Sequence, residues 1–477
     1  MKESVIEKET INTGLIKGIL LLTAFFAMLN ETSVNVALKN FMDVFNISVS
    51  TAQWLISGFM LIMTIVVPVT AFIIKSFSTR KIYFTSMYLL IVGTLLSGLA
   101  TTFSILLVGR LVQATGTCVL MSLLINSMLV LTPPQKRGGA MGMVGLVALF
   151  APAISPTLAG IVIQIFGWRW IFLGLLPILI MLLLIAMNNL KNVTEPIAGK
   201  IDVISIILSI VAFGGILAGI SGVGENGKVN ITTLTPLLVG VVFLILFIWR
   251  QLTIKDPLLE LRVFKNPMYA FGMIMIFFSL MTIFGIVLLV PMFLQGALGI
   301  TASVAGLIML PGGMLNGIAS PLVGRLYDKF GPKPFVILGA LLMMVVCLGL
   351  SFIDSKISIG TFISLHCLIL ISAAMIMTTS QANGLNQLPH SLYPHGTAIM
   401  STLMQLAGGL GSAVYIMLLS INQHKYLETS SEAGDTLNKN ALIYGFNQTF
   451  KVAAMILIIN FIISLFVKRS IAKSEHN

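Results

Sequence analysis

Charged residues are scarce in this sequence. Only 9% of its 477 residues are charged, whereas 57% are hydrophobic and the mean hydropathy is +1.02. Soluble domains carry about 25% charged residues, and a soluble core cannot absorb so much apolar surface. The composition therefore excludes an ordinary water-soluble protein and indicates a chain that crosses a lipid bilayer many times.

Residues that carry enzyme or metal chemistry are also few. The three cysteines lie inside apolar runs without paired metal-ligand spacing, at Cys118, Cys347 and Cys367. We find no phosphate-cradling loop, nucleophile elbow or zinc motif, so we expect no enzyme activity, no metal, no cofactor and no ATP-driven pump. The net charge of +12 comes from short segments between apolar runs rather than from a basic stripe, which argues against nucleic acid as a partner.

Long apolar runs fill most of the chain. A membrane helix needs roughly 20 mainly apolar residues. On that basis the sequence predicts an all-α polytopic membrane protein with fourteen spans, at about 15–38, 52–74, 82–103, 105–131, 139–165, 169–188, 202–223, 232–250, 268–294, 302–325, 334–353, 357–381, 396–420 and 449–468. The first run lacks a small-residue cleavage site, so we expect a retained helix rather than a signal peptide.

The placement of Lys and Arg predicts the orientation of these spans. If the N-terminus is cytoplasmic, most basic residues fall in cytoplasmic segments, so we expect a multi-pass protein of the cytoplasmic membrane with both termini inside. The largest outer loop is expected at 422–448. An interfacial amphipathic segment, "KDPLLELRVFKNP", is expected in the inner linker 251–267.

One carboxylate is expected deep inside a span. Of the 16 acidic residues, Glu31 follows a long apolar run, where an ionised carboxylate costs roughly 3 kcal/mol or more near the bilayer centre. Asn35 lies four residues further and shares its helix face. Glu31 and Asn35 are therefore our candidates for proton coupling and substrate binding, and a purely structural or snorkelling carboxylate is the alternative for Glu31.

Four stretches of the chain carry a family resemblance. "MLNETSVNVAL" resembles the first-helix motif of the fourteen-helix drug:proton antiporter branch of the major facilitator superfamily, with Asn30 where many members have Asp and Glu31 next to it. "GRLVQATGT" resembles the Arg-x-x-Gln-Gly motif of the superfamily. The resemblance implies that Arg110 acts in the proton pathway or holds the bundle near it. A structural link from Arg110 to backbone carbonyls is the alternative.

A third stretch, "GLVALFAPAISPTLAG", resembles the antiporter motif of the superfamily. Small residues such as Gly145 and Gly160 let helices approach closely, and Pro152 and Pro156 remove intrahelical hydrogen bonds and favour a bend. We expect a bent, closely packed gating helix here. Ordinary tight packing is the alternative.

A fourth stretch, "GRLYDKFGPK", matches the cytoplasmic-loop signature of the superfamily through Gly324, Asp328, Gly331 and Lys333. We expect Asp328 to accept hydrogen bonds from helix N-termini or basic residues and to latch one conformation, unless the loop is simply a solvated turn. The counterpart in the first half has Lys75 where the signature has Asp. Unequal gating interactions in the two halves follow from that difference.

The resemblance covers nearly the whole chain and implies its organisation. We expect a six-helix half at 1–190, an inserted helix pair with linkers at 191–255 and a second six-helix half at 256–477. The implied function is a proton-coupled antiporter that confers antibiotic resistance by exporting amphipathic, often cationic, drugs or dyes through alternating access. The expected partners are these small molecules, protons and the lipid bilayer, with the monomer as the working unit. The alternatives are an exporter of one endogenous metabolite and a non-transporting membrane receptor or assembly factor.

Overall fold

The computed structural model describes residues 13–47, 49–193, 202–226, 230–255, 257–430 and 435–470. The regular secondary structure of these ranges is helical, and fourteen segments are long and apolar enough to cross a membrane. This confirms the predicted all-α class and the predicted number of spans. The segment between the spans predicted at 169–188 and 202–223 falls largely outside the described residues.

The N-terminal half contains the first six spans. Its elements are α1 (Thr13–Phe45), α2 (Val49–Ser76), α3 (Thr79–Gly98), α4 (Phe103–Val130), the short η1 (Pro134–Lys136), α5 (Arg137–Phe166), α6 (Trp170–Leu173) and α7 (Leu176–Asn189). The sixth span predicted at 169–188 is confirmed as the candidate span Trp170–Asn189, in which a short turn separates α6 from α7. Pro177 lies in the first turn of α7, where a missing backbone N–H is tolerated. Because it cannot donate a backbone hydrogen bond to the preceding turn, α6 does not run on into α7 as one regular helix.

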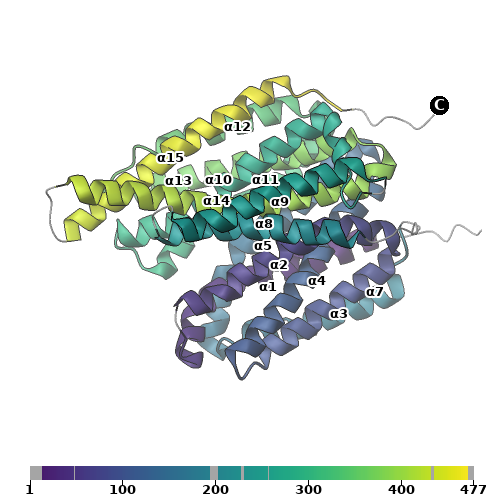
Figure 1. Cartoon of the computed structure of the whole chain (residues 1–477), viewed down its shortest axis with the longest axis horizontal. Helices are drawn as coiled ribbons and strands as arrows, with labels where there is room; N and C mark the ends of the chain where they lie inside the picture. Colours follow the sequence, from purple (N-terminus) through teal and green to yellow (C-terminus); the bar gives the residue numbers. More distant parts are fainter. Residues whose placement is uncertain are drawn as a thin grey trace, which may run out of the picture.

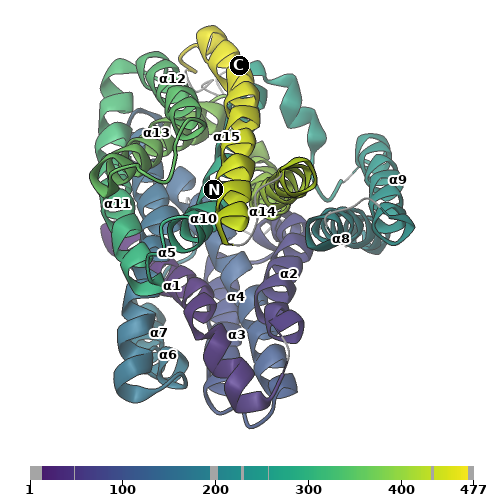
Figure 2. The ribbon, with the colours of Figure 1, turned by 90° about the vertical axis from the view of Figure 1, so that its left-hand side faces the viewer.

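The remaining eight spans form an inserted hairpin and the C-terminal half. The hairpin consists of α8 (Val203–Asn226) and α9 (Ile231–Thr253), and the short η2 (Leu261–Lys265) follows it. The C-terminal half contains α10 (Pro267–Gly296), α11 (Ala302–Phe330), α12 (Lys333–Leu350), α13 (Ile359–Asn386), η3 (His390–Leu392), α14 (Tyr393–Thr429) and α15 (Asp435–Phe466). Figure 1 shows the two halves as separate groups of helices, and Figure 2 shows α8 and α9 standing to one side, next to α2 and α14.

The large outer loop predicted at 422–448 is wrong. Helix α14 continues to Thr429 and α15 already begins at Asp435, so most of that segment is helical. The prediction used apolar length, which locates the part of a helix inside lipid. A helix makes its own backbone hydrogen bonds and can continue into water with polar residues such as "NQHKYLET".

Small residues bring neighbouring helices together, as is usual where lipid provides no hydrophobic drive for packing. A Cβ at Gly93 of α3 would lie 2.7 Å from the Gly109 carbonyl oxygen of α4, and a Cβ at Gly240 of α9 would lie 2.5 Å from the Ile216 nitrogen of α8. We call the face of the bundle at which α1 begins and α15 ends the terminal face, and the other face the opposite face.

Candidate functional site

Arg110 of α4 is the centre of a polar site inside the N-terminal half. Its side chain is only 1% exposed. Nη1 donates to the side-chain oxygen of Asn30 at 3.2 Å and to Oε1 of Gln113 at 3.0 Å, and Nη2 donates to the backbone oxygen of Glu31 at 3.1 Å. The guanidinium lies 4.2 Å from the centre of the Phe59 ring. Neutral oxygens and an aromatic face therefore hold this buried cation.

The network extends from Arg110 to α3. Nε2 of Gln113 donates to the hydroxyl of Thr94 at 2.9 Å, and that hydroxyl donates to the Leu90 carbonyl at 2.6 Å. Gln113 and Thr94 are fully buried. Each partner fixes the next, so the oxygens that receive Arg110 have little freedom to turn away.

Glu31 lies beside this network with an unused carboxyl oxygen. Oε2 is buried and has no hydrogen-bond partner among the described residues, and neither do Nε of Arg110 and Nδ2 of Asn30. Among the residues described, no ion pair joins Glu31 to Arg110; the pairs found are Arg250–Asp202 and Arg262–Glu260. The structure thus places Glu31 and Arg110 together as predicted, but the contact to Arg110 comes from the Glu31 backbone.

The position of Glu31 allows two charge states. Burial without a hydrogen-bond partner favours the neutral carboxylic acid, whereas the nearby Arg110 guanidinium favours the carboxylate. Asn35, one turn further along α1, is exposed and does not share the buried network, so its side chain is available to other groups.

Helix α5 connects this site to the C-terminal half. It is helical without a break through Pro152 and Pro156. The Ser155 hydroxyl donates to the Leu29 carbonyl at 2.8 Å, directly before Asn30 and Glu31. A Cβ at Gly145 would lie 3.4 Å from Ser320 of α11, which agrees with the expected close approach. A Cβ at Gly160 would meet nothing within 4 Å, so the close approach expected there is missing in this conformation.

Asp328 joins the halves at the terminal face. Its two carboxylate oxygens accept the backbone N–H groups of Gly138 and Gly139, at 2.8 and 3.0 Å, in the first turn of α5. A carboxylate at a helix N-terminus satisfies free donors and interacts favourably with the helix dipole. The contact predicted for Asp328 is therefore present.

The glycines around Asp328 allow this contact. A Cβ at Gly324 would lie 2.1 Å from the Gly138 carbonyl oxygen, so any side chain there would force α5 and α11 apart. Gly331 ends α11 with φ +80°, a backbone conformation that other residues rarely adopt. Lys333 is exposed at the start of α12. Among the described residues, a geometric constraint therefore explains why each of these positions of the loop signature, Gly324 and Gly331, holds a glycine.

Arg137 is a cross-half residue that the sequence analysis missed. It begins α5 and is 4% exposed. Its Nη1 donates to Oδ1 of Asn386 at 2.9 Å and to the hydroxyl of Tyr393 at 2.6 Å, and its Nε donates to the Thr132 carbonyl at 3.2 Å. A basic residue at a helix start resembles any topology signal, so the sequence offers nothing that distinguishes Arg137. Arg137 and Asp328 therefore both join the two halves at the terminal face.

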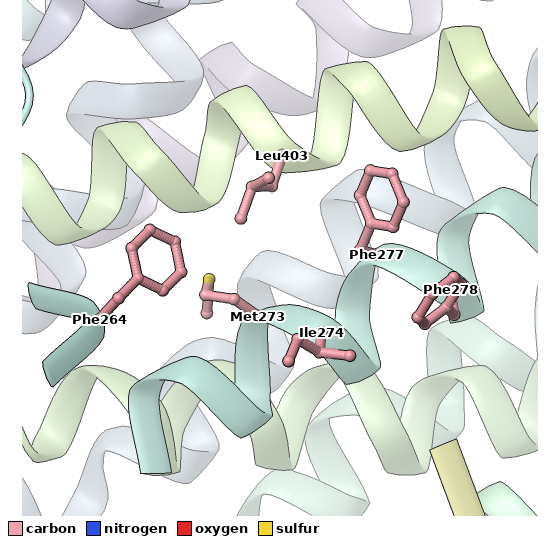
Figure 3. A pocket seen from close by; sticks show the side chains of 6 residues that line it. All are labelled: Phe264, Met273, Ile274, Phe277, Phe278 and Leu403. Carbon is pink, nitrogen blue, oxygen red and sulfur yellow. The ribbon is translucent and has the colours of Figure 1, made fainter. Parts of the chain in front are cut away.

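A separate apolar groove lies between α10 and α14 (Figure 3). It encloses about 270 Å³, and its lining comes from six apolar side chains, Phe264, Met273, Ile274, Phe277, Phe278 and Leu403. The helices touch on either side of it: the Tyr269 hydroxyl donates to the Gly396 carbonyl at 2.7 Å, and Gly411 packs on Met281. Neither α1 nor α4 contributes to the lining, so the groove is distinct from the Glu31 site.

Known proteins resemble this chain along most of its length. Residues 20–412 match the family model described as Major Facilitator Superfamily. The lincomycin resistance protein LmrB of Bacillus subtilis is 45% identical over 460 residues, which are 96% of each chain. The lincomycin resistance protein LmrB of Listeria innocua is 42% identical over 450 residues, 94% of this chain and 96% of that protein.

A solved structure supports the fold. The crystal structure of the human organic anion transporter MFSD10 (TETRAN) superimposes with a TM-score of 0.65 over 95% of this chain and 99% of that one, at 12% sequence identity. Such low identity supports the fold and nothing more specific. The family model, the close relatives and the helical arrangement lead to one assignment. The chain belongs to the major facilitator superfamily of membrane transporters.

Proposed function

We propose that this protein is a proton-coupled antiporter that exports amphipathic, often cationic, drugs across the cytoplasmic membrane. The observation that carries the proposal is the buried, unpartnered carboxyl oxygen of Glu31 next to the Arg110 network. Relatives named for lincomycin resistance support drugs as the cargo. Phe25, Phe26 and Met28 precede Glu31 on α1 and pack against an apolar cluster that includes Leu29, and such side chains would suit the apolar part of such a molecule.

Glu31 would exchange a proton for the cation of a substrate. When protonated, the carboxyl loses most of the cost of burying a charge. When ionised, the carboxylate needs a positive partner. That partner would be a substrate cation or, after a small movement of the Glu31 side chain, the Arg110 guanidinium. Because Arg110 is already held by Asn30, Gln113 and the Glu31 backbone, it can remain in place while the carboxyl changes charge.

The terminal face would be the cytoplasmic face. Among the described residues, more basic side chains lie at that face than at the other. Those at the terminal face are Lys17, Lys75, Arg80, Lys81, Lys136, Arg137, Lys191, Arg250, Lys255, Arg262, Lys265, Arg325, Lys329, Lys333, Lys468 and Arg469. Those at the opposite face are Arg169, Lys356, Lys425, Lys439 and Lys451. The excess of Lys and Arg in short segments follows the positive-inside rule.

Alternating access would use the contacts at the terminal face. Arg137 and Asp328 join the halves here, so with this orientation the structure would represent a state closed towards the cytoplasm. Release of those contacts would open the path for a substrate from inside. A membrane potential supplies about 2.3 kcal/mol per charge per 100 mV, which is enough for uphill export if one net charge moves in each cycle.

Transport by the purified monomeric protein in proteoliposomes tests the proposal. With an imposed pH gradient, the wild type should accumulate a cationic dye or lincomycin against its gradient, and Glu31→Gln should not. Glu428→Gln is the matched control, because Glu428 is exposed near the end of α14. Flux without dependence on the pH gradient would refute proton coupling. Absence of flux for every drug tested would favour a metabolite exporter or a non-transporting membrane protein.

A further inference from the structure

The inserted hairpin lies where the two halves meet. Helix α8 packs against α2 of the N-terminal half and α14 of the C-terminal half (Figure 2). We call this contact region between α2 and α14 the second seam, and the region between α5 and α11 the first seam. The hairpin is therefore in a position to act on the second seam.

Polar contacts hold the hairpin together at the terminal face. Nε and Nη2 of Arg250 each donate to a carboxylate oxygen of Asp202 at 2.9 Å. These bonds hold the pKa of Asp202 below its ordinary value, so the pair is charged at neutral pH. Gln251 is fully buried, and its Nε2 donates to the hydroxyl of Ser205 at 2.6 Å. The ends of α8 and α9 thus form one unit.

Gln251 also holds the segment that leaves the hairpin. Its Oε1 accepts the backbone N–H of Leu259 at 3.0 Å. We call residues 257–265 the linker. The side chains of Leu258, Leu259 and Val263 are buried, so the linker is packed into the protein rather than lying loosely on its surface.

The linker reaches across to α14 and α10. The backbone N–H of Glu260 donates to Nδ1 of His395, which is buried in the first turn of α14, at 3.3 Å. Phe264 covers one end of the apolar groove between α10 and α14 and contacts the ring of Tyr269 edge-on (Figure 3). The linker therefore connects the hairpin to the helices of the C-terminal half at the terminal face.

The second seam lacks the carboxylate that closes the first. At the first seam, Asp328 caps the N-terminus of α5. At the end of α2, Lys75 stands where the loop signature has Asp, and α2 packs against α14, which begins at Tyr393. A cation near a helix N-terminus is unfavourable, so α2 cannot cap α14 as α11 caps α5.

We propose that the linker, held in place by Gln251 of the inserted hairpin, is the latch of the second seam and performs there the role that Asp328 has at the first seam. Gln251 is then a positioning residue for closure of the terminal face. The inference rests on the proposed alternating access, because closure matters only as a step of transport. It assigns a role to the inserted hairpin that the transport chemistry at Glu31 does not require.

The distance between spin labels at Gln135 and Ser391 tests this proposal in the full-length protein. Both residues are exposed at the terminal face, on opposite halves, next to the contact between Arg137 and Tyr393. Gln251→Leu keeps the size of the side chain but removes its bonds to Ser205 and Leu259. The ratio of molecules with short to molecules with long label distances should fall about tenfold, the change expected from the loss of the one bond that holds the linker, the bond from the Leu259 N–H. Gln295→Leu, at an exposed position near the opposite face, should leave the ratio unchanged.

A second substitution separates a latch from general damage to the hairpin. Lys75→Asp restores the carboxylate of the loop signature, so in the Gln251→Leu background it should return the distance ratio to within about twofold of the wild type. Damage to packing alone would not respond to a carboxylate on α2. An unchanged ratio in Gln251→Leu, or a lowered ratio that Lys75→Asp does not restore, overturns the proposal. These distances are measured without a drug substrate. The latch proposal can therefore be refuted while the proposal of drug transport is upheld, and the transport proposal can be refuted while the latch proposal is upheld.

Discussion

Gly324→Ala tests directly whether close contact between α5 and α11 closes the terminal face. The new Cβ would lie 2.1 Å from the Gly138 carbonyl oxygen, whereas real Cβ contacts are essentially never shorter than 3.0 Å. The two helices must therefore separate by about 1 Å. Because the obstacle is backbone at the start of a helix, no side-chain rotation relieves the overlap.

The magnitude follows from this overlap. Added methyl groups in a well-packed region cost about 1–3 kcal/mol. If the open state relieves that overlap, the ratio of closed to open molecules falls by about fivefold to more than a hundredfold, at 1.4 kcal/mol for each factor of ten. The Asp328 contact should weaken with it, because the first turn of α5 moves away.

The assay is the distance between spin labels at Gln135 and Ser391, measured with and without substrate. Gly160→Ala is the matched control on α5, since a Cβ there meets nothing within 4 Å. Gly324→Ala should shift the distances towards long values and Gly160→Ala should not. If Gly324→Ala keeps the wild-type distribution, close packing of α5 on α11 does not determine closure, and our reasoning about the terminal face is refuted.

Three further predictions concern the gate, the buried arginine and the topology. Asp328→Asn removes the charge at the α5 N-terminus, so the closed state should lose about 1 kcal/mol of free energy relative to the open state. The distance between the same two spin labels measures this shift, and an unchanged distance distribution would indicate that the loop is only a solvated turn. Arg110→Lys cannot reproduce the planar fork of bonds, so transport should fall at least about tenfold at matched expression, and retention of wild-type transport would contradict the role of the network. A cysteine at Ser355 should react with an impermeant reagent in intact cells and one at Gln135 only after permeabilisation, whereas labelling of both in intact cells would reject the proposed orientation.

The features that were predictable from the sequence are those determined by lipid and by short motifs. Apolar length alone identified the spans, because every backbone polar group in a membrane must be satisfied within a helix. The Asp328 contact followed from a loop signature whose glycines are needed at fixed positions, as Gly324 and Gly331 show. The ends of α14 and α15 were not predictable in this way, since apolar length says nothing about a helix that continues into water.

The features that were not predictable depend on packing between distant parts of the chain. Arg137 and Tyr393 are 256 residues apart, and no local pattern links them. Gln251 is one amide among many until its bonds to Ser205 and Leu259 are seen. The same holds for Arg110: the sequence suggested a link to backbone carbonyls, and the structure supplies the side chains of Asn30 and Gln113 together with a backbone oxygen.

Proton release on substrate binding tests the central claim most directly. Purified protein in a weakly buffered detergent solution receives a cationic substrate, and the pH of the solution is followed. If Glu31 exchanges its proton for the substrate, the wild type should release protons, Glu31→Asp should release fewer, and Glu31→Gln should release none although it is folded. Proton release from Glu31→Gln equal to that of the wild type would contradict the account and place the proton site on another residue.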